Sequence, residues 1–311
     1  MRIHHDWTGL PADARGASVA MGNFDGVHLG HRSVIDTARA ACDAPLGIIT
    51  FEPHPREFFA GDADARPFRL MNAESRANRL ARLGVDHLYE LPFNAVMAGF
   101  GPADFVHEVL VAGLGVRHVT VGADFCFGRK RSGNAATLIQ LGEAAGFGVT
   151  IAPLIGDGRV EYSSTAIREA LAEGRTRDAE RMLGHWHRID GAVLHGDKRG
   201  RDLGYPTANM AVDGLHLPAL GIYAVLVDVL TGPERGSYKG VASLGVRPMF
   251  DGKRPNLEVH IFDFAGDLYD QHLSVALVEY LRPEAKFDSL QALIEQMDRD
   301  SAMARDILAA R

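Results

Sequence analysis

The sequence predicts an α/β domain built on a doubly wound parallel sheet, followed by a small antiparallel β-barrel domain with a C-terminal helix. Two observations support this. Strand-like and helix-like segments alternate over the first half, and valine- and tyrosine-rich strands separated by Gly, Pro and Asp turns fill most of the second half. The 311 residues suffice for two domains. The change of pattern near 183–187 predicts domains 1–184 and 185–311.

The first half supplies the strands and helices of the parallel sheet. Its predicted strands are Ala17–Met21, Leu46–Phe51, His87–Leu91, His118–Gly122 and Gly148–Ala152. The predicted helices are Arg32–Ala41, Ala73–Leu83, Pro102–Ala112 and Gly133–Ala145, and later Thr165–Glu173 and Arg177–Leu183. Ligands of such sheets bind at the carboxyl ends of strands. We therefore expect the loops that follow the first, second and fourth strands to lie on one rim.

The second half supplies the barrel. Its predicted strands are His187–Leu194, Ile222–Val229, Gly236–Leu244, Leu257–Phe262 and Leu273–Tyr280. The chain then continues into a predicted helix, Leu290–Ala309, whose apolar residues recur at helical spacing.

Composition is that of an ordinary soluble protein, with 46% hydrophobic and 23% charged residues. The net charge of −7 argues against general nucleic-acid binding. Two cysteines cannot build a disulfide framework, which favours a reducing cytosol. No stretch has the apolar length of a membrane span, and residues 1–16 lack the apolar core of a secretory signal. We expect a cytoplasmic protein with small-molecule partners, without nucleic-acid or membrane partners, and of open oligomeric state.

The turn Gly22–His31, between the first strand and the first helix, is the most informative segment. A helix N-terminus presents unpaired N–H groups and a positive dipole end, which suits a phosphate. His28 and His31 share one face of the first helical turn, which indicates chemistry on that phosphate. A metal site is the alternative. It is disfavoured because no further ligands stand at zinc-like spacing and both cysteines are isolated.

A second polar cluster precedes a predicted helix. Ser163, Ser164 and Thr165 offer hydroxyls at the helix start, and Arg168 lies one turn further along. These groups can hold a polyphosphate, although an N-cap with a surface arginine is the commoner meaning of such residues. The basic run Arg129–Arg131 leaves a phosphate contact and a solvated turn equally open.

Both clusters resemble motifs of a known superfamily. His28-Leu29-Gly30-His31 resembles the HxGH motif of nucleotidylyltransferases, and Tyr162–Arg168 is similar to their second motif. Together, Gly22–His31, Thr50–Pro55 and Val121–Gly128 resemble segments of bacterial bifunctional riboflavin kinase/FMN adenylyltransferases. The resemblance to this family extends over nearly the whole chain. The resemblance implies that the FMN phosphate attacks the α-phosphorus of ATP and that FAD forms as pyrophosphate leaves.

The same resemblance implies site residues in the first domain. His28, His31 and Arg168 would act catalytically. Asn23 and Asp124 would contact FMN. The implied ATP- or phosphate-binding positions are Gly22, Phe24, Gly30, Ser163, Ser164 and Thr165.

The stretch Gly196–Asn209 is the third rich segment. By its residues alone, it fits a hairpin with solvated charges about as well as a nucleotide site. It resembles the riboflavin kinase signature GxxRGRxLG[FY]PTAN. That resemblance implies Mg²⁺ and ATP-phosphate binding at Thr207 and Asn209, with ATP contacts at Arg201 and Gly204.

Glu258–Phe264 is similar to the family's strand whose glutamate takes the proton of the riboflavin 5′-hydroxyl, here Glu258. Periodicity alone leaves a solvated glutamate on an edge strand open. Two positions depart from the family pattern: Ser243 stands where an amide is frequent, and Met249 where a hydroxyl is frequent. The main prediction is riboflavin phosphorylation followed by FMN adenylylation. The alternatives are an FMN adenylyltransferase with an impaired kinase module and a non-catalytic flavin-binding regulator.

Overall fold

The computed structural model describes residues 1–60, 67–156, 158, 161–195, 204–249 and 252–310, with backbone alone at 247–249 and 252–254. The chain forms two compact units. The first comprises Met1–Arg66 and Arg76–Tyr162, and the second comprises Pro67–Ser75 and Ser163–Arg311. This division by packing falls before helix α7, whereas the domain boundary between 184 and 185 stays a prediction.

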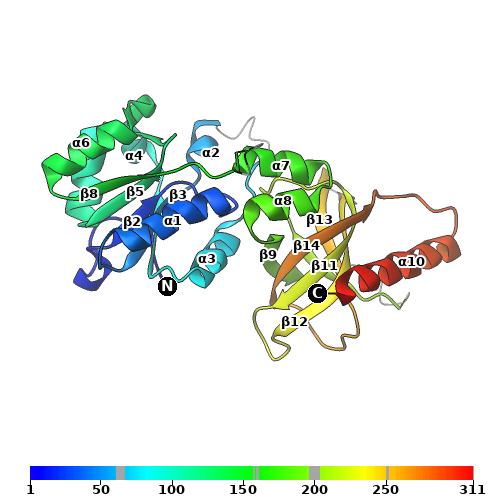
Figure 1. Ribbon diagram of the computed structural model, residues 1–311. Coiled ribbons are helices and arrows are strands. Elements are labelled where there is room, and N and C mark those ends of the chain that lie inside the picture. Colours follow the sequence, from blue (N-terminus) through cyan, green and yellow to red (C-terminus); the bar gives the residue numbers. More distant parts are fainter. Residues whose placement is uncertain (61–66, 157, 159–160, 196–203, 250–251, 311) are drawn as a thin grey trace. The chain divides into compact units, whose positions relative to one another are not determined.

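In the described residues, the first unit contains a six-stranded parallel sheet in the order β1-β4-β3-β2-β5-β8 (Figure 1). The strands are β1 (Arg2–His4), β2 (Ser18–Met21), β3 (Leu46–Glu52), β4 (His87–Pro92), β5 (His118–Gly122) and β8 (Gly148–Ala152). The five predicted strands are confirmed. The three residues of β1 are too few to give a periodic signal, so the sequence pattern does not predict it.

The longer helices of this unit are α1 (Leu29–Ala41), α6 (Ala135–Ala145) and α5 (Pro102–Asp104), which continues as η2 (Phe105–Gly113). Helix α3 (Ala73–Arg82) begins in the second unit and belongs to the first from Arg76 onward. The shorter elements are η1 (Ala12–Ala14), α2 (Pro55–Ala60), α4 (Ala95–Gly99), β6 (Cys126–Phe127), η3 (Arg129–Arg131) and β7 (Gly133–Asn134). Helix α1 begins three residues earlier than predicted because His28 caps it. Helix α6 begins later than predicted, since Gly133 pairs in β7 and Asn134 is the N-cap.

One hydrophobic core of the first unit lies between the sheet and η2. Val19, Ile49 and Val119 from three neighbouring strands are buried together with Val109 and Leu110 of η2. This core holds the strands rigidly, so the loops at their carboxyl ends start from fixed positions.

The second unit contains, among its described residues, a closed antiparallel barrel in the order β10-β13-β12-β11-β14-β9. The strands are β9 (His187–Leu194), β10 (Ala208–Ala211), β11 (Gly221–Val229), β12 (Gly236–Met249), β13 (Gly252–Ile261) and β14 (His272–Arg282). The five predicted strands are confirmed, and β10 is an addition. Because Glu258 lies on β13, which pairs with β10 and β12, the edge-strand alternative for this residue is wrong.

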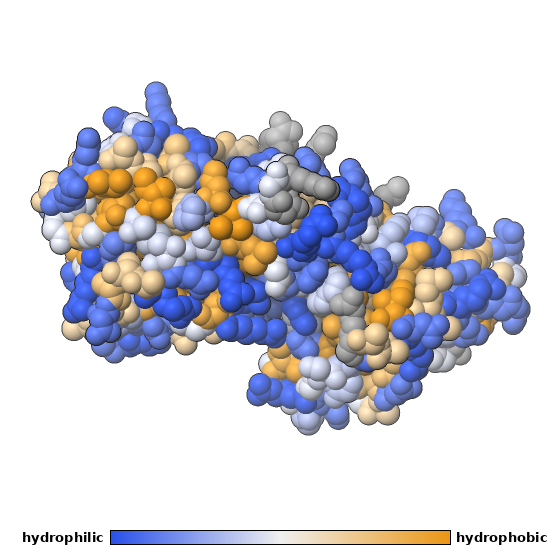
Figure 2. All heavy atoms as spheres, in the orientation of Figure 1, coloured by the Kyte–Doolittle hydropathy of each residue, from blue (hydrophilic) through white to orange (hydrophobic). Residues whose placement is uncertain are grey.

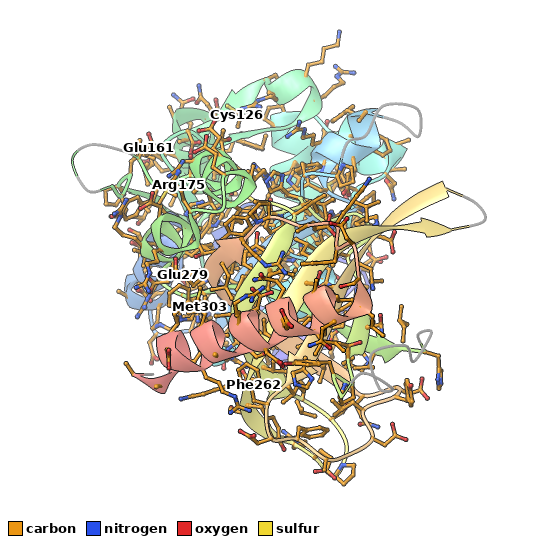
Figure 3. The ribbon with its side chains drawn as sticks, turned by 90° about the vertical axis from the view of Figure 1, so that its right-hand side faces the viewer. Cys126, Glu161, Arg175, Phe262, Glu279 and Met303 are labelled. Atoms are coloured by element: carbon orange, nitrogen blue, oxygen red, sulfur yellow. The ribbon has the colours of Figure 1, made fainter. Side chains whose placement is uncertain are left out.

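Helices α7 (Ser164–Ala172), α8 (Thr176–Leu183) and α10 (Leu290–Ala309) accompany the barrel in the described part of this unit. The predicted bounds of α10 are confirmed, and Ser289 caps it by accepting from the N–H of Ala292. Ala304 and Leu308 of α10 pack against Ala224 and Val278 on the outside of the barrel. Figure 3 shows α10 crossing the barrel strands.

Hydrophilic residues cover much of the face shown in Figure 2, with apolar patches between them, which is usual for a folded protein. None of the helices described is both long enough and apolar enough to cross a membrane.

Candidate active sites

The parallel sheet brings the loops after β2, β3 and β5 to one rim, as predicted. Ala20 of β2 pairs in parallel with Ile48 on one side and with Thr120 on the other. From β2 the chain continues to β3 on one side, and it later returns to β5 on the opposite side. This reversal lies between β2 and β5, and ligands of open α/β sheets bind at such a point. The Gly22–His31 turn and the Asp124 loop both start there.

The turn itself has an uncommon backbone. Phe24 and Val27 have φ values of 51° and 43°, a region that few residues other than glycine adopt. Both side chains are buried, and the Thr50 hydroxyl donates to the carbonyl oxygen of Asn23 over 3.2 Å. Such strain costs on the order of 1–3 kcal/mol per residue and is concentrated at functional sites. The surrounding core therefore holds this turn in a shape it would not adopt alone.

His28 is the N-cap of α1. Its Nδ1 accepts from the backbone N–H of His31 over 3.3 Å. An accepting Nδ1 places the proton of a neutral ring on Nε2. The ring of His28 stacks on that of His31, with centroids 3.7 Å apart and planes 22° apart. The predicted pairing of the two histidines on one face is confirmed.

His31 is held in a neutral state. Burial lowers its pKa well below the ordinary 6.5, and the neighbouring His28 lowers it further. Its Nδ1 is buried and has no hydrogen-bond partner among the described residues. An unsatisfied buried nitrogen is costly, on the order of 1–3 kcal/mol, so a bound polar ligand would relieve this cost.

Gly30 permits the close packing of this turn. A Cβ at this position would lie 3.0 Å from Cε1 and Nδ1 of His28 and 3.3 Å from the carbonyl oxygen of Tyr162. The chain that leads into Ser163 therefore passes directly against Gly30. At Gly22, by contrast, a Cβ would meet the ring of Phe24 at an ordinary 3.6 Å. Among the described residues, a Cβ is therefore crowded at position 30 and is accommodated without crowding at position 22.

The second phosphate-type cluster belongs to the second unit. Ser163 caps α7 as predicted, accepting from the N–H of Ala166 over 3.3 Å. The Nε of Arg168 donates to the carbonyl oxygen of Phe68 over 2.5 Å, and the guanidinium lies 5.4 Å from the centre of the Phe68 ring. Ser164 and Thr165 occupy the first turn of α7. Their joint use with the His28 turn stays a prediction.

The loop after β5 carries the remaining predicted residues of this half. Asp124 is exposed, and Asn23 on the turn after β2 is exposed as well. The basic run Arg129–Arg131 is also exposed, with the N–H of Arg129 donating to the carbonyl oxygen of Phe100. The predicted flavin and phosphate contacts of these residues stay predictions.

An aromatic cluster at the carboxyl ends of β3 and β4 is not predicted by the sequence analysis. Phe51, Phe58, Phe59 and Phe93 meet edge to face, with ring centroids 5.2–5.8 Å apart. Phe59 is 69% exposed. Phe58 and Phe59 lie in α2, just after the family-like segment Thr50–Pro55. Two adjacent phenylalanines beside such a segment are the sequence signal that could have identified this cluster.

The barrel brings predicted kinase residues together. Asn209 of β10 and Ser243 of β12 are the direct neighbours of Glu258 on its two flanking strands. Leu257 and Val259 on either side of Glu258 are buried in the barrel core, so the row Asn209–Glu258–Ser243 lies on the outer face. Directly opposite residues have Cβ atoms about 4.5–5.5 Å apart. A predicted magnesium ligand and the predicted base are therefore adjacent.

Asn209 is 8% exposed and its amide is engaged on both sides. Its Nδ2 donates to the carbonyl oxygen of Thr207 over 3.4 Å, and its Oδ1 accepts from Asn256 over 3.1 Å. Thr207 is half-buried and directly precedes β10. These contacts fix the side chain of Asn209 next to Thr207.

Hydrogen bonds hold the segment before β10 at Tyr205 and at Pro206. The Tyr205 hydroxyl donates to Asp298 of α10, and the His260 ring bonds to the carbonyl oxygen of Pro206 over 2.9 Å. Gly204 is exposed with a φ of 80°, which favours glycine. Arg201 and the side chain of Met249 lie outside the described residues.

The two units have the architecture of an enzyme that joins a nucleotidyl-transfer domain to a flavin-kinase barrel. Residues 10–166 match the family described as FAD synthetase, and residues 183–308 match the family described as Riboflavin kinase. The chain belongs to the bifunctional riboflavin kinase/FMN adenylyltransferase family, and both of its domains are enzyme domains.

Relatives of that name match over nearly their full length. The chain is 41% identical over 304 residues to the one from Pseudomonas fluorescens, covering 96% of each chain. It is 39% identical over 298 residues to the one from Escherichia coli K12, covering 95% of this chain and 94% of that one. It is also similar to a crystal structure described as a macrolide-efflux protein from Streptococcus pneumoniae. That structure has a TM-score of 0.82 and 30% identity, with 98% of each chain covered.

Proposed function

We propose that this enzyme phosphorylates riboflavin to FMN on the outer face of its barrel and then transfers AMP from ATP to FMN at the carboxyl ends of β2 and β5, giving FAD and pyrophosphate. Family membership supports both activities. The single observation that best supports adenylyl transfer is the stacked His28–His31 pair at a helix N-terminus, in which burial lowers the pKa of His31 and the Nδ1 of His31 is buried.

In adenylyl transfer, an oxygen of the FMN phosphate attacks the α-phosphorus of ATP in line with the departing pyrophosphate. No protein nucleophile is needed, so positioning and charge neutralisation do most of the catalytic work. The N-terminal N–H groups of α1 and the Nε2–H of His28 supply donors for the triphosphate. Bound phosphate would raise the lowered pKa of His31, because a nearby anion favours the protonated ring.

The remaining predicted residues divide between the two substrates. Ser164, Thr165 and Arg168 hold the β- and γ-phosphates in this proposal, with hydroxyls and a guanidinium as donors. The exposed ring of Phe59, held edge to face against Phe58, supplies an apolar surface on which the flavin ring can stack. Asn23 and Asp124 supply polar contacts at the same rim.

In riboflavin phosphorylation, Glu258 accepts the proton of the 5′-hydroxyl as that oxygen attacks the γ-phosphorus of ATP, and ADP leaves. Thr207 and Asn209 offer oxygen donors beside Glu258, the donor type that suits Mg²⁺ shared with phosphates. Mg²⁺, when bound there, would neutralise phosphate charge. Ser243 supplies a hydroxyl on the other side of Glu258.

The proposal includes a cytoplasmic location and small-molecule substrates alone. Cys42 and Cys126 are both free thiols, which fits a reducing compartment.

Two single substitutions test the assignment of one activity to each site. We expect His31→Ala to convert riboflavin to FMN and stop there. We expect Glu258→Gln to leave riboflavin unchanged while still converting added FMN to FAD. Loss of both activities in either well-folded variant would contradict separate sites, and wild-type FAD formation by His31→Ala would remove the histidine pair from the mechanism.

A further inference from the structure

A segment from within the first family match is packed into the second unit. Phe68, Leu70 and Met71 are 7%, 0% and 5% exposed. The backbone of this segment bridges to Leu215, and the amide of Asn72 donates to the carbonyl oxygen of Asp190 over 2.8 Å. Residues 67–75 are thus fixed on the same unit that carries α7 and Arg168.

Arg168 is held by this segment at its side chain and by His216 at its backbone. The carbonyl oxygen of Phe68 accepts from Nε over 2.5 Å, and the Phe68 ring lies 5.4 Å from the guanidinium carbon. The carbonyl oxygen of Arg168 bonds to Nε2 of His216 over 2.9 Å. These contacts restrict the plane and the reach of a side chain that is otherwise flexible.

The orientation of a guanidinium matters for phosphate binding. Its N–H groups form a rigid planar fork, so a phosphate is bound well only when that plane is aimed correctly. A fork that is oriented before the ligand arrives loses less side-chain freedom on binding. The contacts of Phe68 supply this orientation within the protein itself.

We propose that Phe68 is a positioning residue for Arg168 in FMN adenylylation, acting through its ring and its carbonyl oxygen to orient the guanidinium toward the ATP phosphates. This rests on the proposed function, in which Arg168 binds those phosphates. Phe68 does not touch substrate in this proposal, and its effect passes through Arg168.

The test compares Phe68→Leu and Phe68→Met with Met71→Leu in the full-length enzyme. The two Phe68 variants keep an apolar side chain and the backbone carbonyl but remove the ring. Met71→Leu changes a buried side chain of the same segment that has no place in the site. FMN adenylylation and riboflavin phosphorylation are measured separately, each over a range of ATP concentrations.

We expect both Phe68 variants to raise the KM for ATP in adenylylation about three- to fivefold, the scale of a lost cation–π contact. The kcat of adenylylation and the kinetics of riboflavin phosphorylation should stay within about twofold of the wild type. Met71→Leu should leave both activities unchanged. A KM for ATP that does not change, or an equal loss of both activities, would overturn the positioning role.

Arg168→Ala separates failure of this inference from failure of the proposed function. If Arg168→Ala leaves adenylylation unchanged, Arg168 does not bind ATP and the proposed function fails at this residue. If Arg168→Ala is impaired, the double variant with Phe68→Leu should bind ATP no worse than Arg168→Ala alone, because coupled residues are not additive. Additive effects would contradict action through Arg168.

Discussion

Replacing Gly30 by alanine tests whether close packing holds the histidine pair in its working position. The added Cβ would lie 3.0 Å from the His28 ring and 3.3 Å from the carbonyl oxygen of Tyr162. Both distances are shorter than usual Cβ contacts, so the His28 ring or the Tyr162 carbonyl must shift by a few tenths of an ångström. The His28 ring can move more easily than backbone, and its movement would weaken the cap and the stacking on His31.

The expected effect on stability is small because two terms oppose each other. Alanine is favoured over glycine inside a helix by about 1 kcal/mol. A weakened N-cap costs about 1 kcal/mol. The expected effect on activity is larger. Removing one preorganised donor from a charged transition state costs about 10²–10³ in kcat. A displaced donor should therefore cost about ten- to hundredfold, or roughly 1.4–2.7 kcal/mol.

The assay measures FAD formation from FMN and ATP, riboflavin phosphorylation, and thermal unfolding. Gly99→Ala is the matched control, since Gly99 ends α4 and a Cβ there would meet no heavy atom within 4 Å. We expect Gly30→Ala to reduce adenylylation about ten- to hundredfold while riboflavin phosphorylation is retained. Gly99→Ala should leave both activities unchanged. Wild-type FAD formation by Gly30→Ala would refute the role given to the packing around His28.

Three further predictions concern the metal, the barrel and acid stability. Chelation with EDTA should stop riboflavin phosphorylation, and excess Mg²⁺ should restore it; activity that persists in EDTA would count against oxygen ligation at Thr207 and Asn209. Ser243→Ala should change riboflavin phosphorylation about two- to tenfold while adenylylation stays constant, because Ser243 lies directly opposite Glu258 in the barrel. Burial, with smaller effects of His185 and His216, lowers the pKa of His187 from 6.5 to about 3. The unfolded chain therefore takes up a proton here before the folded protein does, and the free energy of unfolding falls as the pH falls below 6.5. Between pH 7 and pH 5 His187 should lower the free energy of unfolding, measured with denaturant, by about 2 kcal/mol; an equal pH dependence in His187→Gln would contradict this.

Local patterns predicted much of the fold and of the first site. The turn from Gly22 to His31 was predictable because an apolar strand, a glycine-rich turn and a helix follow one another directly. Strand β10 was not, since Ala208–Ala211 is short and lacks alternation. The pairing of Asn209 with Glu258 depends on the register between distant strands, which no local pattern encodes.

Phe68 illustrates the other limit of sequence reasoning. Its place in the chain assigns it to the first domain, yet its packing and its hydrogen bond to Arg168 place it in the second unit. Contacts between residues so far apart along the chain depend on tertiary packing. A single sequence therefore predicts the motif residues but not the residues that orient them.

The central claim is that one chain performs two reactions in series. The most direct measurement incubates the wild-type enzyme with riboflavin, ATP and Mg²⁺ and separates the flavins by chromatography over time. We expect FMN to rise first and FAD to follow at its expense, with pyrophosphate released as FAD forms. Unchanged riboflavin, with FAD made only from added FMN, would contradict a working kinase, and binding of flavins without any conversion would contradict catalysis altogether.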